Sequence, residues 1–466
     1  MADAAHSLNL RVAAGRALRR DCPRRTHALW RPSPQRDPIA MLQRSSEDRV
    51  QHLVPIRYGR MLQSPFAFYR ATALLHAFDL ADTPHSGIRT QLCGDCHLMN
   101  FGGFATPERN LLFGINDFDE TLPGFWEWDL KRLTTSFVLA ARYRSLSDAK
   151  AREIVQRLVA SYRHHIDQYA AMKTLDLWHA SISFDDVRRA LPAGAMRDYV
   201  GTLAERARKR TSRHAFDKMT ATRDGVRRIL DNPPYIFHPD ASPDFARYQV
   251  NYRDVAFEMF GAYTRTLHQY RRHLIERFEL VDVVFKVVGV GSVGTRCFVL
   301  LMLADDDDPL FLQAKEAKPS VLAPYMGRSQ FRHQGERVVA GQRLMQAASD
   351  QFLGWTTGPE GRHYYIRQLR DMKVAVEVEL MDAEMLAHYA ELCAWNLARA
   401  HAKGGGTGPE IAGYVGDRPN LDLALADYAV LYADQTERDY DTFVKAVRAG
   451  TLPADTGDDR ALAQTP

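Results

Sequence analysis

The stretch VDVVFKVVGVGSVGTRCFVLLMLA (residues 281–304) decides the expected fold. Two runs rich in β-branched and aromatic residues flank a glycine-rich segment, which is the pattern of two strands joined by a turn. Gly289, Gly291 and Gly294 form a GxGxxG motif that also contains Ser292. In a dinucleotide-binding fold this motif lies between a strand and a helix, whereas here it joins two strands. We therefore expect a hairpin whose backbone amides are suited to cover phosphate groups; an ordinary glycine-rich turn is the alternative.

The strand predicted next, LFLQAKEA, carries Lys315. A lysine on an apolar strand suits phosphate binding when a carboxylate holds its ammonium group in place. Glu336, in the helix predicted for GERVVAGQRLMQAAS, is the expected partner. Glu316 is the alternative, although it would point to the opposite face of the strand. The alternative to a phosphate-binding role is that Lys315 is a surface lysine whose aliphatic stem lies along the strand.

The segment GDCHLMNFG (residues 94–102) has the composition of a phosphoryl-transfer loop. Such loops need a carboxylate that orients or deprotonates an acceptor hydroxyl, and an amide oxygen that binds Mg²⁺. Asp95 and Asn100, five positions apart, supply these groups and are predicted to be the catalytic residue and a metal ligand. A turn capped by Asp and Asn is the alternative interpretation.

The segment INDFDE (residues 115–120) follows the apolar strand predicted for NLLFGI. Asp117 and Asp119 would lie at the end of this strand and offer hard oxygen ligands to Mg²⁺. A DxD pattern alone is more often a solvated strand end, but Asp117 here follows Asn100 by 17 residues, across a predicted hairpin. Kinase-like enzymes place their metal-binding Asp at this distance beyond the catalytic loop.

Together these segments supply the parts of one kinase-like site, but in an unusual order. A kinase runs from glycine loop and lysine to the catalytic and metal residues, whereas here the catalytic and metal segments come first. We therefore predict an α+β, protein-kinase-like, two-lobed fold with a circularly permuted chain. The expected regions are a disordered basic arm (1–45), the first part of the large lobe with the catalytic and metal loops (46–173), a helical part that holds the acceptor (174–280), a small β-rich nucleotide-binding lobe (281–375) and C-terminal helices that return to the large lobe (376–466).

The composition of the 466-residue chain is that of a globular protein, with 45% hydrophobic and 25% charged residues and a net charge of +4. The first 45 residues are rich in arginine but lack an aromatic stacking pattern, so no nucleic-acid partner is expected. We found no apolar run long enough for a membrane span and no secretory signal, which predicts a cytoplasmic protein without membrane contact. The five cysteines do not indicate a disulfide framework, and the pair formed by Cys93 and Cys96 has no second pair with which to bind zinc.

Over about residues 50–450 the sequence resembles the DUF2252 family of uncharacterised bacterial proteins. The stretches that carry the resemblance are LVPIRYGRMLQSPFAFYRA, QLCGDCHLMNFGGFATPERNLLFGINDFDETLPGFWEWDLKRL, VVGVGSVGTRCFVLLM, LFLQAKEAKPSVL, GERVVAGQRLMQAASDQFLGW, YYIRQLRDMK and LARAHA. The family is grouped with the protein-kinase-like fold, so the resemblance implies this fold and a nucleotide site. It implies no substrate.

The chain is also similar, more distantly, to aminoglycoside and choline kinases, whose loops read HGDxHxxN and IDFxD. On this pattern Asp95 matches the catalytic Asp, Asn100 the metal Asn and Asp117 the metal Asp. His97 matches the loop His, Asp119 the second carboxylate, and WDLKRL resembles the segment that follows. The sequence departs from these patterns at two positions. Cys93 stands where those kinases have their first His, and Gly114 stands where an acidic residue is usual.

The function expected from these features is an ATP- and Mg²⁺-dependent phosphotransferase acting on a small molecule or a protein. Transfer of AMP would use the same residues with the nucleotide turned around. A non-catalytic nucleotide-binding pseudokinase is a further alternative, although every expected catalytic residue type is present. A two-metal phosphoesterase is disfavoured because such sites need an Asn-His pair, which the chain lacks, and because it leaves the glycine loop and Lys315 unexplained.

Overall fold

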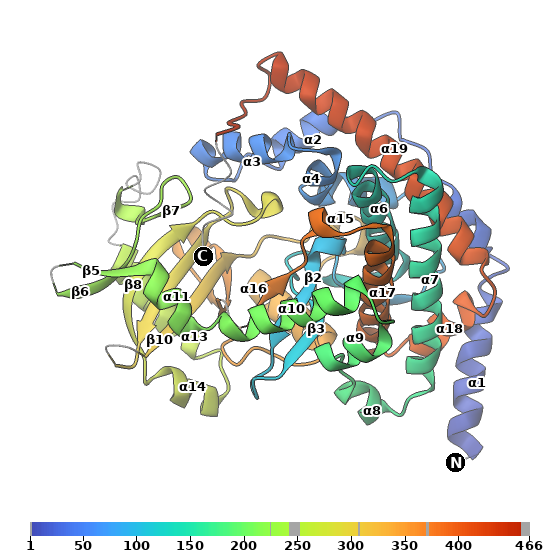
Figure 1. Cartoon of the computed structure of the whole chain (residues 1–466), viewed down its shortest axis with the longest axis horizontal. Coiled ribbons are helices and arrows are strands. Elements are labelled where there is room, and N and C mark those ends of the chain that lie inside the picture. Colours follow the sequence, from blue (N-terminus) through green and yellow to red (C-terminus); the bar gives the residue numbers. More distant parts are fainter. Residues whose placement is uncertain (1, 224, 242–251, 306–307, 370–371, 458–466) are drawn as a thin grey trace.

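The computed structural model describes residues 2–223, 225–241, 252–305, 308–369 and 372–457. The protein has an α+β fold, as the sequence predicts. Figure 1 shows a sheet-rich part on one side, long helices on the other, and the hairpin of β2 (Phe101–Ala105) and β3 (Leu111–Ile115) between them. Residues 101–115 meet residues 374–405 in this central region.

The largest sheet is antiparallel and has six strands in the order β11-β12-β10-β9-β8-β7. Its strands are β7 (Ile236–Phe237), β8 (Glu279–Lys286), β9 (Cys297–Leu303), β10 (Pro309–Glu316), β11 (Gly354–Thr357) and β12 (His363–Gln368). β8 pairs with β9 on either side of the glycine-rich segment, which confirms the predicted hairpin. Every residue of β10 is buried, because this strand lies in the middle of the sheet and helices cover it.

Helices pack on this sheet as amphipathic elements. α11 (Ser212–Met219) contacts β10, α13 (Tyr252–Thr264) contacts β8 and β11, and α16 (Gln334–Met345) contacts β11 and β12. Much of the segment 174–280, expected to be a helical part of a large lobe, therefore packs on the sheet instead. Its hairpin of β5 (Thr220–Arg223) and β6 (Val226–Ile229) also lies against β8.

Two smaller sheets form from the segments predicted to carry the site. β1 (Arg89–Leu92) pairs with β4 (Leu122–Phe125), and β2 and β3 form a sheet with β13 (Val374–Ala375). The helix α17 (Ala383–Gly405) packs against β1 and β3, so it supports the loops after both strands. It ends at Gly406, whose φ of +64° favours glycine.

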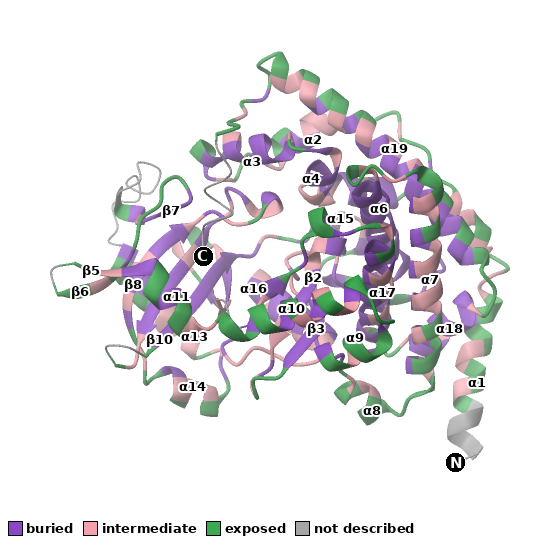
Figure 2. Ribbon diagram, in the orientation of Figure 1, coloured by how far each residue is buried: buried purple, intermediate pink, exposed green. Residues whose placement is uncertain are grey.

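The helical part is built around α6 (Glu127–Tyr143), α7 (Asp148–Ala171), α17 and α19 (Asn420–Arg448). Figure 2 shows α6 and α17 buried along most of their length. In this core Trp126 stacks on Tyr162 with ring centroids 5.7 Å apart, and the Tyr162 hydroxyl lies 2.8 Å from His401 Nδ1. These contacts join segments that are far apart in the sequence.

The remaining elements connect these layers. They are the helices α3 (Val54–Met61), α4 (Pro65–Arg70), α5 (Ala73–Leu80), α8 (Thr174–His179), α9 (Phe184–Ala190), α10 (Ala195–Lys209), α14 (Gln269–Ile275) and α15 (Ala323–Met326), and the short turns η2 (Gln51–Leu53), η3 (Leu98–Asn100), η4 (Pro239–Ala241), η5 (Val290–Ser292), η6 (Pro359–Gly361) and η7 (Val378–Leu380). Across the described ranges, no helix combines the length and apolar character that crossing a membrane requires.

The N-terminal segment is ordered, and the prediction of a disordered arm over 1–45 is wrong for its described residues. It forms α1 (Ala2–Ala17), η1 (Arg24–Ala28) and α2 (Pro38–Arg44), and α1 packs on α18 (Gly408–Val415). Arg11 Nε lies 2.7 Å from Glu410, and Arg19 Nε donates to the Tyr414 carbonyl at 2.8 Å. The arginines looked like a solvated tail in the sequence because their partners lie about 400 residues further along the chain.

Candidate functional site

One buried carboxylate holds the loop that follows β1. The backbone N–H groups of Cys93 and Gly94 donate to Asp129 Oδ2 at 2.7 Å and Oδ1 at 2.9 Å. Asp129 lies in the first turn of α6, and its Oδ2 is 3.3 Å from His401 Nε2. Gly94 has a φ of +90°, and a Cβ there would lie 2.3 Å from the Glu120 carbonyl oxygen. Only glycine fits this position without displacing a neighbour.

Asp95 follows directly and has a fixed, partly accessible carboxylate. Its Oδ1 accepts a hydrogen bond from Arg132 Nε at 2.6 Å, and its side chain is 23% exposed. Arg132 is buried in α6, and its Nη2 also donates to the Tyr69 carbonyl at 2.9 Å. His97 Nε2 is 3.9 Å from Asp95 Oδ2, and burial lowers the pKa of His97 to about 4. A neutral imidazole therefore lies beside Asp95 near neutral pH.

Asn100 ends the same loop, and its amide orientation is determined by a hydrogen bond. Its Nδ2 donates to the Asp95 carbonyl oxygen at 2.6 Å. A carbonyl oxygen can only accept, so the amide nitrogen must face it. The amide oxygen of Asn100 is left for another partner, and the residue lines the cavity described below.

Asp117 and Asp119 follow β3 and share one lysine. Lys315 Nζ lies 3.3 Å from Asp117 Oδ2 and also forms an ion pair with Asp119. Tyr365 donates its hydroxyl to Asp119 Oδ1 at 2.8 Å. Burial and the Asp117 charge raise the pKa of Asp119, whereas Lys315 overcomes burial and holds the pKa of Asp117 below its usual range. Lys315 and Asp117 are thus in contact although they are 198 positions apart in the sequence.

The glycine loop between β8 and β9 contributes three of its four predicted residues to the cavity. Gly289, Gly291 and Ser292 line it. Gly294 does not, and serves the turn instead: its φ is +82°, and its carbonyl oxygen accepts from the Val50 N–H at 2.8 Å. The tip of the hairpin is therefore attached to the segment that precedes α3.

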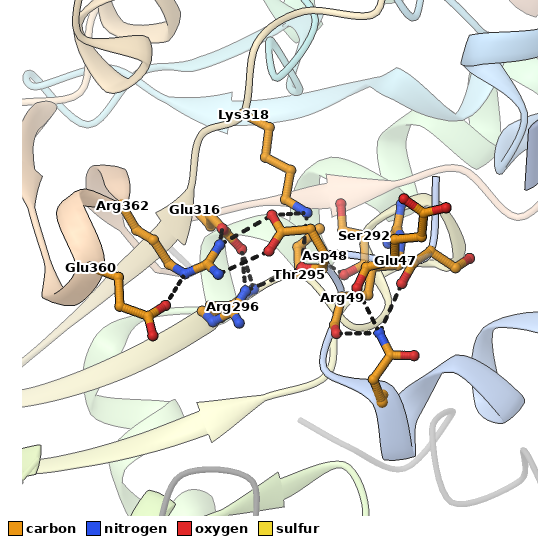
Figure 3. Close-up of polar contacts among 12 residues, drawn as sticks. Glu47, Asp48, Arg49, Ser292, Thr295, Arg296, Glu316, Lys318, Glu360 and Arg362 are labelled. Atoms are coloured by element: carbon orange, nitrogen blue, oxygen red, sulfur yellow. Dashed lines mark hydrogen bonds and ion pairs between the residues drawn. The ribbon is translucent and has the colours of Figure 1, made fainter. Parts of the chain in front are cut away.

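Charged groups strengthen this attachment (Figure 3). Asp48 accepts from Arg362 Nη2 at 2.9 Å and lies 3.0 Å from Lys318 Nζ. Arg362 also pairs with the buried carboxylate of Glu316 at 2.8 Å, and Glu316 lies 3.4 Å from Arg296 Nη1. Hydrogen bonds to Arg362 and Lys318 outweigh burial and lower the pKa of Asp48 to about 2. Glu316 therefore ties the start of β9 and the start of β12 to residue 48, and does not pair with Lys315.

Glu336, the expected partner of Lys315, is not brought to the lysine. It lies in the first turn of α16, where its N–H donates to His333 Nδ1 at 3.3 Å, and it does not line the cavity. The next residue, Arg337, faces the acidic loop and donates to the carbonyl oxygens of Asp119 at 2.8 Å and Thr121 at 2.6 Å. The two aspartates take the place that we predicted for Glu336.

These groups surround a cavity of about 700 Å³. Eight of the predicted site residues line it: Asp95, Asn100, Asp117, Asp119, Gly289, Gly291, Ser292 and Lys315. Its basic lining residues are Arg44, Arg49, Arg57, Arg70, Lys286, Lys315, Lys318, Arg367 and Lys373, and its acidic ones are Asp48, Asp95, Asp117, Asp119, Glu120 and Glu316. The nine basic against six acidic side chains favour an anionic ligand.

Residues 41–75 form one wall of the cavity, and sequence reasoning missed this wall. None of the described residues of 174–280, where we expected the acceptor, lines the cavity. The segment 41–75 reads in the sequence as ordinary amphipathic helix with scattered arginines, so it gave no functional signal. Lys373, on another side of the cavity, was also missed. Burial and the charge of Arg367 lower its pKa to about 7.

The oxygen atoms at the acidic loop fit a divalent cation. No group of three or more His, Cys, Asp or Glu side chains within the described ranges is arranged to hold a metal ion. The predicted set, however, consists of two carboxylates and one amide, and the side chains of Asp117 and Asp119 are 34% and 27% exposed. The amide oxygen of Asn100 takes no part in the hydrogen bond to the Asp95 carbonyl, and such an oxygen is a ligand that hard cations prefer.

Glu120 is a further titratable group of the cavity, and its effect on stability can be predicted. Burial raises its pKa to about 7, against the opposing charge of Arg337. The folded protein then keeps this proton while the unfolded chain loses it near pH 4.5, so the free energy of unfolding falls as pH rises from about 4.5 to 7. Glu120→Gln should remove this fall and stabilise the protein at pH 8 by roughly 1–3 kcal/mol relative to wild type. Denaturant unfolding at pH 5 and pH 8 measures the difference.

The exposed Glu108 serves as the control, since Glu108→Gln makes the same change outside the cavity. Its stability profile should follow that of wild type at both pH values. Equal profiles for Glu120→Gln and wild type would contradict the assignment of a proton to Glu120 at neutral pH.

Comparison with known proteins identifies a family but no activity. The family model described as "Uncharacterized protein conserved in bacteria (DUF2252)" matches residues 49–446, which contain every predicted site residue. No curated protein matches the chain, and no solved structure does. A function must therefore be argued from the site.

Proposed function

The chain belongs to the DUF2252 family, whose description names no activity, and from its site we propose that it is an ATP- and Mg²⁺-dependent phosphotransferase. The acceptor would be a hydroxyl group of a small molecule or a protein. One observation carries the proposal. The predicted phosphate-binding residues and the predicted catalytic and metal residues, from separate halves of the chain, line one cavity and meet at Lys315.

The proposed fold is a two-lobed, protein-kinase-like fold with a circularly permuted chain. In this scheme β8, β9, β10, α16, β11 and β12 correspond to the small lobe, in kinase order. In an unpermuted kinase a long helix leads into the catalytic loop. Here α17 contacts β1 and β3, whose loops carry Asp95 and Asp117, although it follows them in the chain by more than 250 residues. This proximity supports the permuted order.

The residues of the cavity would have the following roles. Lys315 and the backbone amides of the glycine loop would bind the phosphates, and Asn100, Asp117 and Asp119 would hold Mg²⁺. The metal would supply charge neutralisation for the phosphate oxygens. Asp95, fixed by Arg132, would accept the proton of the acceptor hydroxyl. The bond from the hydroxyl oxygen to the γ-phosphorus would form as the bond from that phosphorus to the bridging oxygen of ADP breaks.

Two related functions use the same residues. In AMP transfer the acceptor oxygen would attack the α-phosphorus of a nucleotide bound in the reverse direction. In a pseudokinase the nucleotide would bind without turnover. Both share the first step of the proposal, which is nucleotide binding in this cavity, and the products formed after incubation with ATP distinguish the three.

Calorimetric titration with ATP, with and without Mg²⁺, tests that shared step. We expect Mg²⁺-dependent binding that Lys315→Ala and Asp117→Ala each weaken by about tenfold or more, because each removes a charge at the phosphates or the metal. Lys218→Ala, which removes an exposed lysine outside the cavity, should bind ATP as wild type does. A folded wild-type protein that does not bind ATP at millimolar concentration would exclude the phosphotransferase. Phosphoesterase activity at the acidic loop would then be the function to assay.

A further inference from the structure

Arg70, the last residue of α4, differs from Arg49 and Arg57, two other arginines on its wall of the cavity. Arg57 donates to Ser46 Oγ and to the Ala71 carbonyl, and Arg49 donates to the carbonyls of Ser45 and Val293. Both therefore hold the wall together. Arg70 makes no hydrogen bond or ion pair with any described residue, and its Nε is buried without a partner. The residue as a whole is half-buried, and a buried N–H group without an acceptor is costly unless a ligand supplies one.

The surroundings of Arg70 indicate where that ligand group would lie. The carbonyl oxygen of Arg70 is 3.2 Å from the position that a Cβ on Gly291 would occupy, so the end of α4 contacts the tip of the glycine loop. Arg70 and Asp95 line the same cavity, and the charge of Asp95 acts on the guanidinium. Its guanidinium also lies over the ring of Phe66, whose centroid is 5.8 Å from Cζ. Arg70 therefore lies beside the loop that would cover the phosphates, and it lines the same cavity as the carboxylate that would face the acceptor.

We propose that the guanidinium of Arg70 binds the terminal phosphate of the nucleotide, the group that is transferred. The assignment rests on the proposed phosphotransferase function. Guanidinium binds phosphate oxygens through paired N–H donors, and a cation at the transferred group stabilises the charge that spreads over its oxygens during transfer. Arg70 would thus act directly on the reacting phosphoryl group, whereas Lys315 and the glycine loop hold the remainder of the triphosphate.

The test compares ATP with ADP, because only ATP carries the phosphate that Arg70 would contact. Calorimetric titration of Mg²⁺-ATP and Mg²⁺-ADP into wild type and Arg70→Met should show ATP affinity falling about ten- to hundredfold, while ADP affinity changes little. Methionine keeps the apolar stem that packs near Phe66, and a thermal melt verifies folding. Arg70→Lys keeps the charge but lacks the planar pair of donors, so its affinity for ATP should lie between those of wild type and Arg70→Met.

Arg277→Met is the matched control, because it makes the same change at an exposed arginine outside the cavity. It should leave both affinities unchanged. Equal losses of ATP and ADP affinity in Arg70→Met would overturn the assignment to the terminal phosphate. Unchanged affinities would also overturn it and would direct attention to an anionic acceptor. A wild type that binds neither nucleotide would instead overturn the proposed function itself, and the Arg70 assignment with it.

Discussion

Arg36→Met is expected to lower the free energy of unfolding by about 3–5 kcal/mol. The guanidinium of Arg36 is 4% exposed and lies between two buried carboxylates, 2.8 Å from Asp79 and 2.6 Å from Asp439. It joins the N-terminal segment to α5 and α19. Without it, two buried carboxylates keep only neutral donors, Tyr432 for Asp79 and Gln435 for Asp439, and lack their counter-charge. Burial already raises the pKa of Asp79 in the wild type.

Denaturant unfolding measures this loss, and its pH dependence identifies the cause. Protonation relieves an unpaired buried carboxylate, so the loss should be smaller at pH 5 than at pH 8. Arg20→Met, at an exposed arginine of the same segment, should change stability by less than about 0.5 kcal/mol. If Arg36→Met behaves like Arg20→Met, the N-terminal segment does not dock through this pair.

Gly94→Ala is expected to cost about 2–5 kcal/mol and to abolish Mg²⁺-dependent ATP binding in the range of concentrations that saturates wild type. A non-glycine residue at a φ of +90° costs roughly 1–2 kcal/mol. The added methyl group would also lie 2.3 Å from the Glu120 carbonyl oxygen, and relieving such overpacking costs about 1–3 kcal/mol more. Relief requires the loop of Asp95 to move away from the loop of Asp119, which would separate the predicted catalytic and metal residues.

Gly87→Ala is the control that carries the first of these costs, the backbone strain, without the second, the close contact. Gly87 has a φ of +83°, but nothing lies within 4 Å of its added Cβ. It should therefore lose only the roughly 1–2 kcal/mol of backbone strain and should bind ATP as wild type does. Equal stabilities and equal ATP affinities for the two variants would show that the close approach at Gly94 is unimportant.

The local structure of the site could be predicted from the sequence. The strand runs on either side of the glycine motif indicated a hairpin, and the apolar run before Asp117 indicated a strand; both are present as β8–β9 and β3. Eight predicted residues share one cavity because each lies at the end of such a locally determined element. Local sequence patterns determine the strands and turns, and the strands and turns determine where each side chain lies.

Partners supplied by distant segments could not be predicted in the same way. Glu336 was chosen by its position in a kinase pattern, yet Lys315 pairs with the two aspartates, which already lie at its end of β10. The sequence predicts the acceptor region over 174–280, whereas the cavity is lined by residues 41–75 and by none of the described residues of 174–280. The N-terminal arginines were judged by local composition, which contains no information about Glu410 or Asp439.

The docking of α1 on α18 has a consequence for synthesis of the chain. Arg11 and Glu410 are 399 residues apart, and a ribosome adds about 5–20 residues per second, so the first helix emerges about 20–80 s before its partner. Lys315 likewise emerges about 10–40 s after Asp117. A protein with this topology cannot fold from its N-terminus as it is made. Its helical core is completed only after α17 and α19 have been made, and its site only after β10 has been made, so until then the early segments lack these partners.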